Sequence, residues 1–358
     1  MASQEISTFE ENDFSQVPPA DIVAYNELRS CADLFRMYEE GILDIQPDFQ
    51  RDVVWSPASM TRFIDSLIKQ LPIPSMCISL DYKTQRWQVI DGLQRLSSII
   101  NFLSHDSKWV LSKLKDIDPQ ISGVATQEFR VAESSLNFLR RRVENTSIPI
   151  TVVRCDYSKP EHTSYLFTIF HRLNTGGVKL NNQEIRNCIF SGSFNNMLKE
   201  VNKLDAWVNV TGQKRSTRTR YLWIEQILRF FAFHDSAHEY NGALSRFLNN
   251  YMLEHRNDPV EDLSEKARLF ERSATVVSMV RSAIPDGVWS RTILETLMYG
   301  VGCNIDHLET LHTDHIIEKV QLLRTKESLS SAVLSSDLSS REKVGARLQD
   351  AKAIFGEV

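Results

Sequence analysis

One junction constrains the fold of this chain more than any other feature: at Asp91-Gly92 the hydrophobic pattern changes from alternation to helical spacing. Residues 86–90 alternate and are β-prone, which predicts a strand. Apolar side chains then recur at Leu93, Leu96, Ile99, Ile100 and Leu103, as in a helix. The segment therefore folds as strand, sharp turn and helix. The free amides and positive dipole end of such a helix suit an anion, although strand-turn-helix junctions are also common structural turns.

Composition limits the classes of protein that this chain can represent. Its 358 residues predict two domains, and a formal net charge of -5 argues against a generally basic surface for nucleic acid, so any such contact must be local. The five cysteines form no C-x-x-C pair, which favours free thiols in a reducing compartment over a zinc or disulfide framework. The acidic N-terminal segment is no targeting signal, and no apolar run has the length of a membrane span. A cytoplasmic protein is expected.

The pattern along the chain predicts an α+β protein in three parts: a flexible N-terminal arm at 1–25, a mixed α/β domain at 26–160 and an all-helical domain at 161–358. The clearest helix opens at Ser56-Pro57, an N-cap followed by a first-turn proline. A further helix is expected at 32–40, an extended segment at 45–51, a hairpin of strands at 76–80 and 86–90, and a helical region around 105–145. Another strand is expected at 148–153, where Pro149 indicates either an edge strand or the beginning of the strand.

A second polar element follows the expected helix that ends at Asn174. Thr175-Gly176-Gly177 forms a loop, and Asn181 with Glu184 reads as a capping box for the next helix. A helical hairpin with a glycine cap explains this pattern. The additional polar side chains also fit a nucleotide or metal-phosphate pocket; they are Asn174, Thr175, Gln183, Glu184 and Arg186.

Four other segments allow two interpretations each. Arg51, beside Gln50, either clamps a phosphate over Trp55 or forms a surface salt bridge above a core tryptophan. Asp65 lies off the apolar stripe of its helix, so its side chain is either turned toward the arginine-rich site or solvated, and the solvated position is favoured. The segment 213–220 either contacts DNA or is a solvated loop, and its cations are Lys214, Arg215, Arg218 and Arg220. His312 and His315 suggest an HNH-type nuclease less well than a pair of helix-surface histidines. P-loop, dinucleotide-binding and nucleophile-elbow motifs are absent from the sequence.

Several of these motifs, in this order, resemble the N-terminal domain family of GmrSD-type modification-dependent restriction systems. The resemblance covers about residues 30–255 and extends less clearly into the helical remainder. The matching motifs are Gln50-Arg51 with Trp55, Ile64-Asp65-Ser66-Leu67 leading into Pro72-Ile73-Pro74, Ile90-Asp91-Gly92-Leu93-Gln94-Arg95-Leu96, Phe170-His171-Arg172-Leu173-Asn174-Thr175-Gly176-Gly177 and Leu180-Asn181-Asn182-Gln183-Glu184-Ile185-Arg186-Asn187.

The resemblance implies a ParB/sulfiredoxin-like α/β core that binds and hydrolyses a nucleoside triphosphate, as an NTPase would, and relatives in this family act in defence against phage DNA. It implies that Asp91, Gln94 and Arg95 are catalytic, with Asp91 holding Mg²⁺ or polarising water. The residues implied for nucleotide binding are Gln50, Arg51, Gly92, Asn174, Thr175, Gly176, Gln183 and Arg186. No resident protein metal site is implied beyond Mg²⁺ that accompanies the nucleotide.

One departure from the family motif bears on the activity. Leu93 stands where the family has its first glutamine, which favours nucleotide binding over hydrolysis. The C-terminal part also lacks a convincing nuclease motif, so a separate nuclease subunit is expected as the partner of a sensor or regulatory protein. Two other functions stay open: a metal-dependent DNA nuclease or nickase that uses the same acidic residues, and a non-catalytic protein-interaction module.

Overall fold

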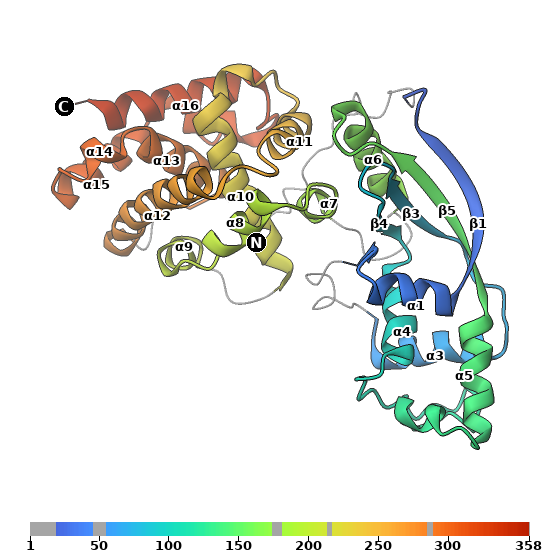
Figure 1. Cartoon of the computed structure of the whole chain (residues 1–358). Coiled ribbons are helices and arrows are strands. Elements are labelled where there is room, and N and C mark those ends of the chain that lie inside the picture. The colour runs from blue at the N-terminus through green and yellow to red at the C-terminus, as the bar shows by residue number, and fades with distance from the viewer. Residues whose placement is uncertain (1–18, 46–54, 174–180, 213–216, 285–288, 358) are drawn as a thin grey trace. The chain divides into compact units, whose positions relative to one another are not determined.

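The computed structural model describes residues 19–45, 55–173, 181–212, 217–284 and 289–357 (Figure 1). The chain forms two compact units. One consists of Gln16–Leu180 and carries the sheet, and the other contains Asn181–Val358 and is helical in its described residues. The expected α+β class is therefore confirmed. The α/β unit extends to Leu180 and includes the helix that follows the boundary expected at residue 160.

The α/β unit is built on a five-stranded mixed sheet in the order β1-β5-β3-β4-β2. β3 pairs with β4 and β5 pairs with β1 in antiparallel fashion, whereas β3 with β5 and β2 with β4 are parallel. The strands are β1 (Val23–Ser30), β2 (Leu43–Asp44), β3 (Met76–Asp81), β4 (Arg86–Asp91) and β5 (Ser147–Cys155). β3 and β4 form the predicted hairpin, and every residue of β3 is buried, so both faces of the central sheet are covered.

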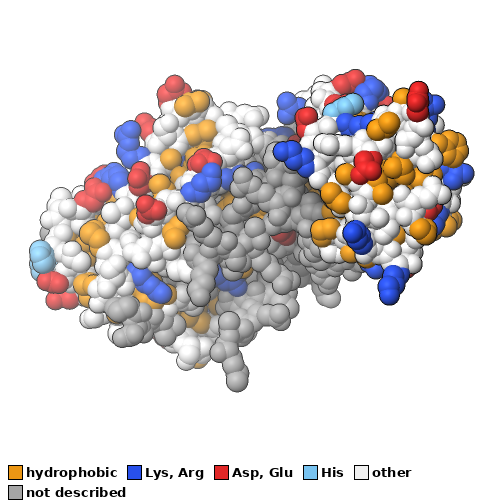
Figure 2. All heavy atoms as spheres, turned by 90° about the horizontal axis from the view of Figure 1, so that it is seen from below, with side chains coloured by type: hydrophobic (Ala, Val, Ile, Leu, Met, Phe, Trp, Pro, Cys, Tyr) orange, Lys and Arg blue, Asp and Glu red, His pale blue; other side chains and the backbone are white. Residues whose placement is uncertain are grey.

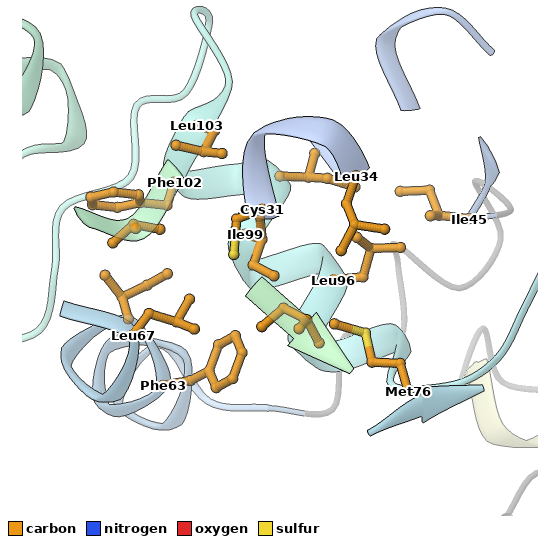
Figure 3. Close-up of a cluster of buried hydrophobic side chains, with 14 of the residues drawn as sticks. Cys31, Leu34, Ile45, Phe63, Leu67, Met76, Leu96, Ile99, Phe102 and Leu103 are labelled. Atoms are coloured by element: carbon orange, nitrogen blue, oxygen red, sulfur yellow. The ribbon is translucent and has the colours of Figure 1, made fainter. Parts of the chain in front are cut away.

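Helices cover the two faces of this sheet. On one face Ile78 and Leu80 join an apolar cluster with side chains from α1, α3 and α4 (Figure 3). On the other face Ser79 hydrogen-bonds Tyr157, which leads into α6, and α6 packs against β4. The helices of the unit are α1 (Cys31–Glu39), α3 (Pro57–Ile68), α4 (Leu93–Leu103), the short η2 (Thr126–Arg130), α5 (Ser135–Asn145) and α6 (Pro160–Leu173).

The local signals for α3 act as expected. The Ser56 hydroxyl accepts the Ser59 amide at 3.2 Å, and Pro57 occupies the first turn. Phe63, Ile64 and Leu67 then bury the apolar stripe in the cluster. Asp65 corrects the expectation of a solvated side chain: it is 6% exposed, pairs with Lys69 at 2.7 Å and accepts the Asp118 amide at 2.9 Å. The carboxylate therefore joins α3 to the loop at residue 118.

Three further expectations about the α/β unit differ from the structure. β1 was not predicted, because its side chains are mostly exposed and give little apolar alternation. The region 105–145 is helical only in η2 and α5, since Pro119 and Gly123 favour turns before residue 126. β5 is an interior strand, yet Pro149 lies near its start as the alternative prediction had it. Pairing with β3 begins only at Ile150, so the missing N–H of Pro149 breaks no bond to β3.

The helical unit packs its helices around an aromatic core that includes Trp207, Phe230 and Phe270. Its helices are α7 (Asn182–Ile189), α8 (Ser193–Val201), α9 (Asp205–Thr211), α10 (Thr217–Ser236), η4 (Ala237–Glu239), α11 (Leu244–Glu254), α12 (Val260–Ala283), α13 (Arg291–Cys303), α14 (Ile305–Leu308), α15 (Thr313–Arg324), η5 (Glu327–Leu329), η6 (Val333–Ser335) and α16 (Arg341–Gly356). The predicted all-helical character of this half is confirmed in its described residues.

Two global observations agree with the composition. None of the helices in the described ranges is long and apolar enough to cross a membrane. The five cysteines are free thiols. In the face seen in Figure 2, Lys and Arg side chains are interspersed with Asp and Glu, and hydrophobic side chains are exposed over the α/β unit.

Candidate functional site

The strand-turn-helix junction forms as predicted, between β4 and α4. Gly92 is the N-cap of α4 and has φ +97°, a left-handed conformation that glycine adopts without strain. A Cβ at this position would lie 2.6 Å from Cγ of Met76. Glycine is thus required by the turn and by close packing against β3, independently of any ligand.

No side chain caps the N-terminus of α4. Within the described residues, the amides of Leu93, Gln94 and Arg95 have no hydrogen-bond acceptor, and the first bonded amide of the helix is that of Leu96, to the Gly92 carbonyl at 2.9 Å. These three N–H groups and the positive end of the helix dipole form an anion-compatible position.

Arg95 and Asp91 flank that helix end and bind each other. Nη2 of Arg95 lies 2.9 Å from Oδ2 of Asp91. Arg95 also donates to the carbonyls of Pro74 and Ser75, at 2.5 and 3.3 Å. Its side chain is 13% exposed, whereas that of Asp91 is 40% exposed. Burial lowers the pKa of Arg95 and the charge of Asp91 counteracts this, so the partner carboxylate stabilises the cation.

Cys77 lies opposite Asp91 in the β3–β4 pair. Burial, with a smaller contribution from the Asp91 charge, raises the pKa of the Cys77 thiol to about 12. The sulfur is therefore a neutral thiol at physiological pH and is no nucleophile.

Gln94 connects the junction to the start of α3. Its side-chain oxygen accepts the backbone N–H of Trp55 at 3.3 Å, and the Trp55 ring packs edge-on against Phe63 at 5.7 Å. Trp55 is partly buried against the core, which agrees with the structural interpretation of this residue. Leu93 packs against the same core, so the residue that departs from the family motif has an apolar role here.

The remaining residues predicted to bind the nucleotide form two groups: those outside the described residues and those in the helical unit. Gln50 and Arg51, and the loop residues Asn174, Thr175 and Gly176, lie outside the described residues. Gln183 and Arg186 are described, and both lie in α7 of the helical unit. The Asn181–Glu184 capping box is confirmed, with the Glu184 amide donating to Asn181 at 2.9 Å and the Asn181 amide donating to Glu184 at 2.6 Å.

Arg186 is bound within the interior of the helical unit. Its side chain is 1% exposed and donates to Asn249 at 2.9 Å, Glu225 at 3.0 Å, Ser245 at 3.2 Å and Gln183 at 3.3 Å. Burial lowers its pKa. The structure thus gives Arg186 and Gln183 an internal role, and it brings neither together with Arg95 in one unit.

A buried ion network extends from Arg186, and the sequence patterns gave no indication of it. Glu225 binds both Arg186 and Arg229, at 3.0 and 2.7 Å. Glu295 in turn binds Arg229 and Arg347, at 3.1 and 2.7 Å. The partners are separated by up to 66 residues along the chain, so local periodicity contains no signal for their pairing.

The other candidate segments are placed as follows. Lys214 and Arg215 lie outside the described residues, and the side chains of Arg218 and Arg220 are not described. His312 and His315 lie exposed at the start of α15, which confirms the interpretation as surface histidines. No group of three or more His, Cys, Asp or Glu among the described residues could hold a metal ion.

Comparison with known proteins bears on the α/β unit. Residues 31–191 match the family model described as GmrSD restriction endonuclease, N-terminal domain. No curated protein and no solved structure matches the chain significantly. The matched span begins with α1, includes the β4–α4 junction and ends just after α7. The match indicates a protein of a GmrSD-like restriction system, and residues 31–191 belong to the GmrSD restriction endonuclease N-terminal domain family.

Proposed function

We propose that this protein binds a nucleoside triphosphate at the β4–α4 junction and acts as the sensor or regulatory subunit of a GmrSD-like DNA restriction system. One observation carries the proposal: the uncapped N-terminus of α4 lies beside a cation, Arg95, and an accessible carboxylate, Asp91. Both groups lie within the family match. Helix amides and an arginine suit phosphate oxygens, and one carboxylate suits Mg²⁺ that remains coordinated by phosphates and water.

In this proposal some residues of the site bind phosphate and another binds Mg²⁺. The amides of Leu93, Gln94 and Arg95 receive phosphate oxygens, and Arg95 supplies a guanidinium fork. Asp91 is the residue that holds Mg²⁺, and the donor set fits because Asp91 is 40% exposed and is the carboxylate at the helix end. The ion, when bound with the nucleotide, neutralises phosphate charge.

The ion pair between Arg95 and Asp91 gives the site two arrangements. Without ligand, the carboxylate balances the guanidinium at 2.9 Å. A phosphate that binds the α4 amides competes with Asp91 for Nη2 of Arg95, and the released carboxylate becomes available to Mg²⁺. Phosphate and metal therefore favour each other's binding at this junction.

The side chains at the junction support binding more than hydrolysis. Leu93 packs into the core, and the oxygen of Gln94 accepts the Trp55 amide. Leu93 has no polar group that could orient an attacking water, and the side-chain oxygen of Gln94 already accepts a hydrogen bond. A protein that binds a nucleotide without turning it over fits a sensor, with DNA cleavage assigned to a separate nuclease subunit. The predicted DNA contacts of Lys214, Arg215, Arg218 and Arg220 remain part of this proposal.

Titration of the full chain with a panel of nucleoside triphosphates, with and without Mg²⁺, tests the proposal. We expect Arg95→Met to weaken binding by about two orders of magnitude, as loss of a strong charge-assisted contact would. Arg62→Met is the matched control, because Arg62 lies in the same unit and pairs with Asp116 on the surface. Wild-type protein that binds no nucleotide, or equal affinities for the Arg95 variant and wild type, would contradict the proposal.

A further inference from the structure

One edge of the sheet in the α/β unit is long and unprotected. β1 forms this edge and, among the described residues, pairs with β5 alone (Figure 1). Its eight residues pair with β5 without a register shift, whereas the strand at the opposite edge, β2, has two residues. Proteins commonly protect an edge strand with lysine, proline, a bulge or short length. β1 has none of these features, so its outer side can accept another strand.

The hydrogen bonds to β5 use every second residue of β1. The amide of Cys31, the residue after β1, donates to the Thr146 carbonyl at 3.0 Å, in continuation of the β1–β5 register. Bonded positions alternate in an antiparallel pair, so the odd-numbered residues of β1 bond to β5. Pro149 agrees with this assignment, because it has no N–H and lies opposite an even-numbered residue, Leu28. The backbone groups of the even-numbered residues therefore point to the open side of the sheet.

Three residues of β1 present backbone donors and acceptors at this open edge: Ala24, Asn26 and Leu28. Their N–H groups have no acceptor in the described part of the chain. Apolar side chains of the strand are exposed as well, since Leu28 is 71% exposed and Val23 is 46% exposed. A row of unpaired backbone groups beside exposed apolar side chains is what an added β-strand binds. A β-strand is therefore the kind of partner that this edge fits.

The spacing of these residues makes the edge complementary to itself. When two copies of β1 pair antiparallel about a two-fold axis, Asn26 can face Asn26, and Ala24 then faces Leu28 of the other copy. All the outward residues named above are then bonded to one another. In the two adjacent registers one of them would instead face Ile22 or Ser30. The Ile22 amide already donates within a turn, and Ser30 is the N-cap of α1, whose carbonyl accepts the first bond of the helix.

The side chains agree with this register. Tyr25 faces Glu27 of the other copy and Val23 faces Arg29, so no like charges are opposed, whereas in one adjacent register Glu27 would face itself. Within one copy Glu27 and Arg29 bind each other at 2.5 Å, which balances their charges. Leu28 packs against the other strand and loses exposure to water. A second copy of this chain therefore satisfies both the backbone and the side chains of the edge.

We propose that β1 binds β1 of a second copy of this chain, so that two sheets join into one across a two-fold axis at Asn26. The pairing supplies partners to the outward backbone groups and covers exposed apolar side chains. A single strand pair buries less area than a standard interface, so we expect a reversible dimer with a Kd on the order of 10 μM. The interface does not rest on the nucleotide site proposed at the β4–α4 junction.

Sedimentation velocity of the full chain, at concentrations from about 1 to 200 μM, tests the proposal. We expect the wild type to convert from monomer to dimer in this range. Leu28→Lys places a flexible cation at the paired edge and should raise the Kd at least about tenfold, because an edge lysine opposes strand addition. Val260→Lys is the matched control, because Val260 is 72% exposed on the helical unit and should leave the Kd unchanged. Thermal midpoints near that of the wild type show that both variants fold.

Cysteine cross-linking tests the register. Asn26→Cys should form a disulfide between two copies under mild oxidation, because residue 26 faces itself at the distance of paired strands. Leu28→Cys should not, since residue 28 faces residue 24 and lies too far from its own copy for a disulfide. The wild type, whose five cysteines are free thiols, gives the background of this experiment.

Three results would overturn the proposal. The first is a wild type that remains a monomer over the whole concentration range. The second is a Kd of Leu28→Lys equal to that of the wild type, which would assign the dimer to another surface. The third is cross-linking of Leu28→Cys without cross-linking of Asn26→Cys, which would exclude the pairing centred on Asn26.

Discussion

Arg95 binds Asp91 across the first turn of α4, with 2.9 Å between Nη2 and Oδ2, and this pair lies at the junction where we propose that a nucleotide binds. The arginine is largely buried and the carboxylate is accessible. Removal of either partner therefore has different consequences. Loss of Asp91 leaves a buried cation that needs an anion, and loss of Arg95 leaves a carboxylate that water can solvate.

Asp91→Asn should separate the two roles proposed for the carboxylate, which are pairing with Arg95 and holding Mg²⁺. Without Mg²⁺, the variant should bind phosphate or nucleotide more tightly than wild type, by about tenfold, because Asp91 no longer competes for Arg95. With Mg²⁺, the gain in affinity that wild type shows should disappear. Calorimetric titrations with and without Mg²⁺ measure both effects. A variant that keeps the full Mg²⁺ response would show that Asp91 holds no metal.

Gln94→Met should loosen the start of α3. The substitution removes the acceptor of the Trp55 amide at similar side-chain volume, so we expect a loss of about 1 kcal/mol in the free energy of unfolding. Hydrogen exchange at the Trp55 amide should become faster. Gln94→Glu is the matched control, because it keeps an acceptor oxygen and should retain the protection of that amide. Equal exchange in Gln94→Met and wild type would show that the bond is not maintained in solution.

The parts of the site that sequence reasoning predicted are the local ones. The change of hydrophobic periodicity at Asp91-Gly92 predicted the strand, the turn and α4. The spacing of Asn181 and Glu184 predicted the capping box of α7. The hydrogen bond from the Trp55 amide to Gln94 joins residues 39 positions apart, and no pattern along the chain predicts it. Contacts of this length follow from how the elements pack.

Arg186 is a second case in which sequence patterns did not predict long-range contacts. Its place in a family motif and its polar neighbours favoured a phosphate ligand, and no pattern along the chain indicated its partners Glu225 and Asn249, which lie on later helices of the same unit. β1 was missed for a related reason: an edge strand exposes most of its side chains, so the alternation that reveals a strand is weak. Arg186 is buried and the side chains of β1 are mostly exposed, and such differences in burial arise only when the chain folds.

Gly92→Ala should destabilise the α/β unit by about 2–4 kcal/mol. One part of this cost is the left-handed backbone at φ +97°, and the other is the contact of the new Cβ with Met76 at 2.6 Å. Replacement of Met76 by alanine in the same chain removes the second part only. Urea denaturation of the two single variants and the double variant measures the coupling. Strictly additive losses would show that Met76 does not restrict this position.

Glu295→Gln should destabilise the helical unit more than any surface charge substitution. Glu295 binds Arg229 and Arg347, and its side chain is 2% exposed. Removal of the charge leaves two buried guanidinium groups without this counter-ion, at a cost of about 3–5 kcal/mol. Glu200→Gln, which breaks an exposed pair with Lys203, is the control and should change stability by less than about 1 kcal/mol. Denaturant midpoints that do not distinguish the two variants would contradict a structural role for the network.

The same network predicts how stability responds to acid. Burial alone would raise the pKa of Glu225, but the charges of Arg229 and Arg186 and their hydrogen bonds lower it from the usual 4.5 to about 2. A carboxyl group whose pKa is lower in the folded state stabilises that state above its unfolded pKa. This stabilisation, about 3 kcal/mol, should be lost as the pH falls from 4.5 towards 2. Glu225→Gln should lower the stability at neutral pH and flatten the dependence in that range. Chemical denaturation at a series of pH values compares the two proteins, and parallel curves for variant and wild type would show that Glu225 does not titrate in this way.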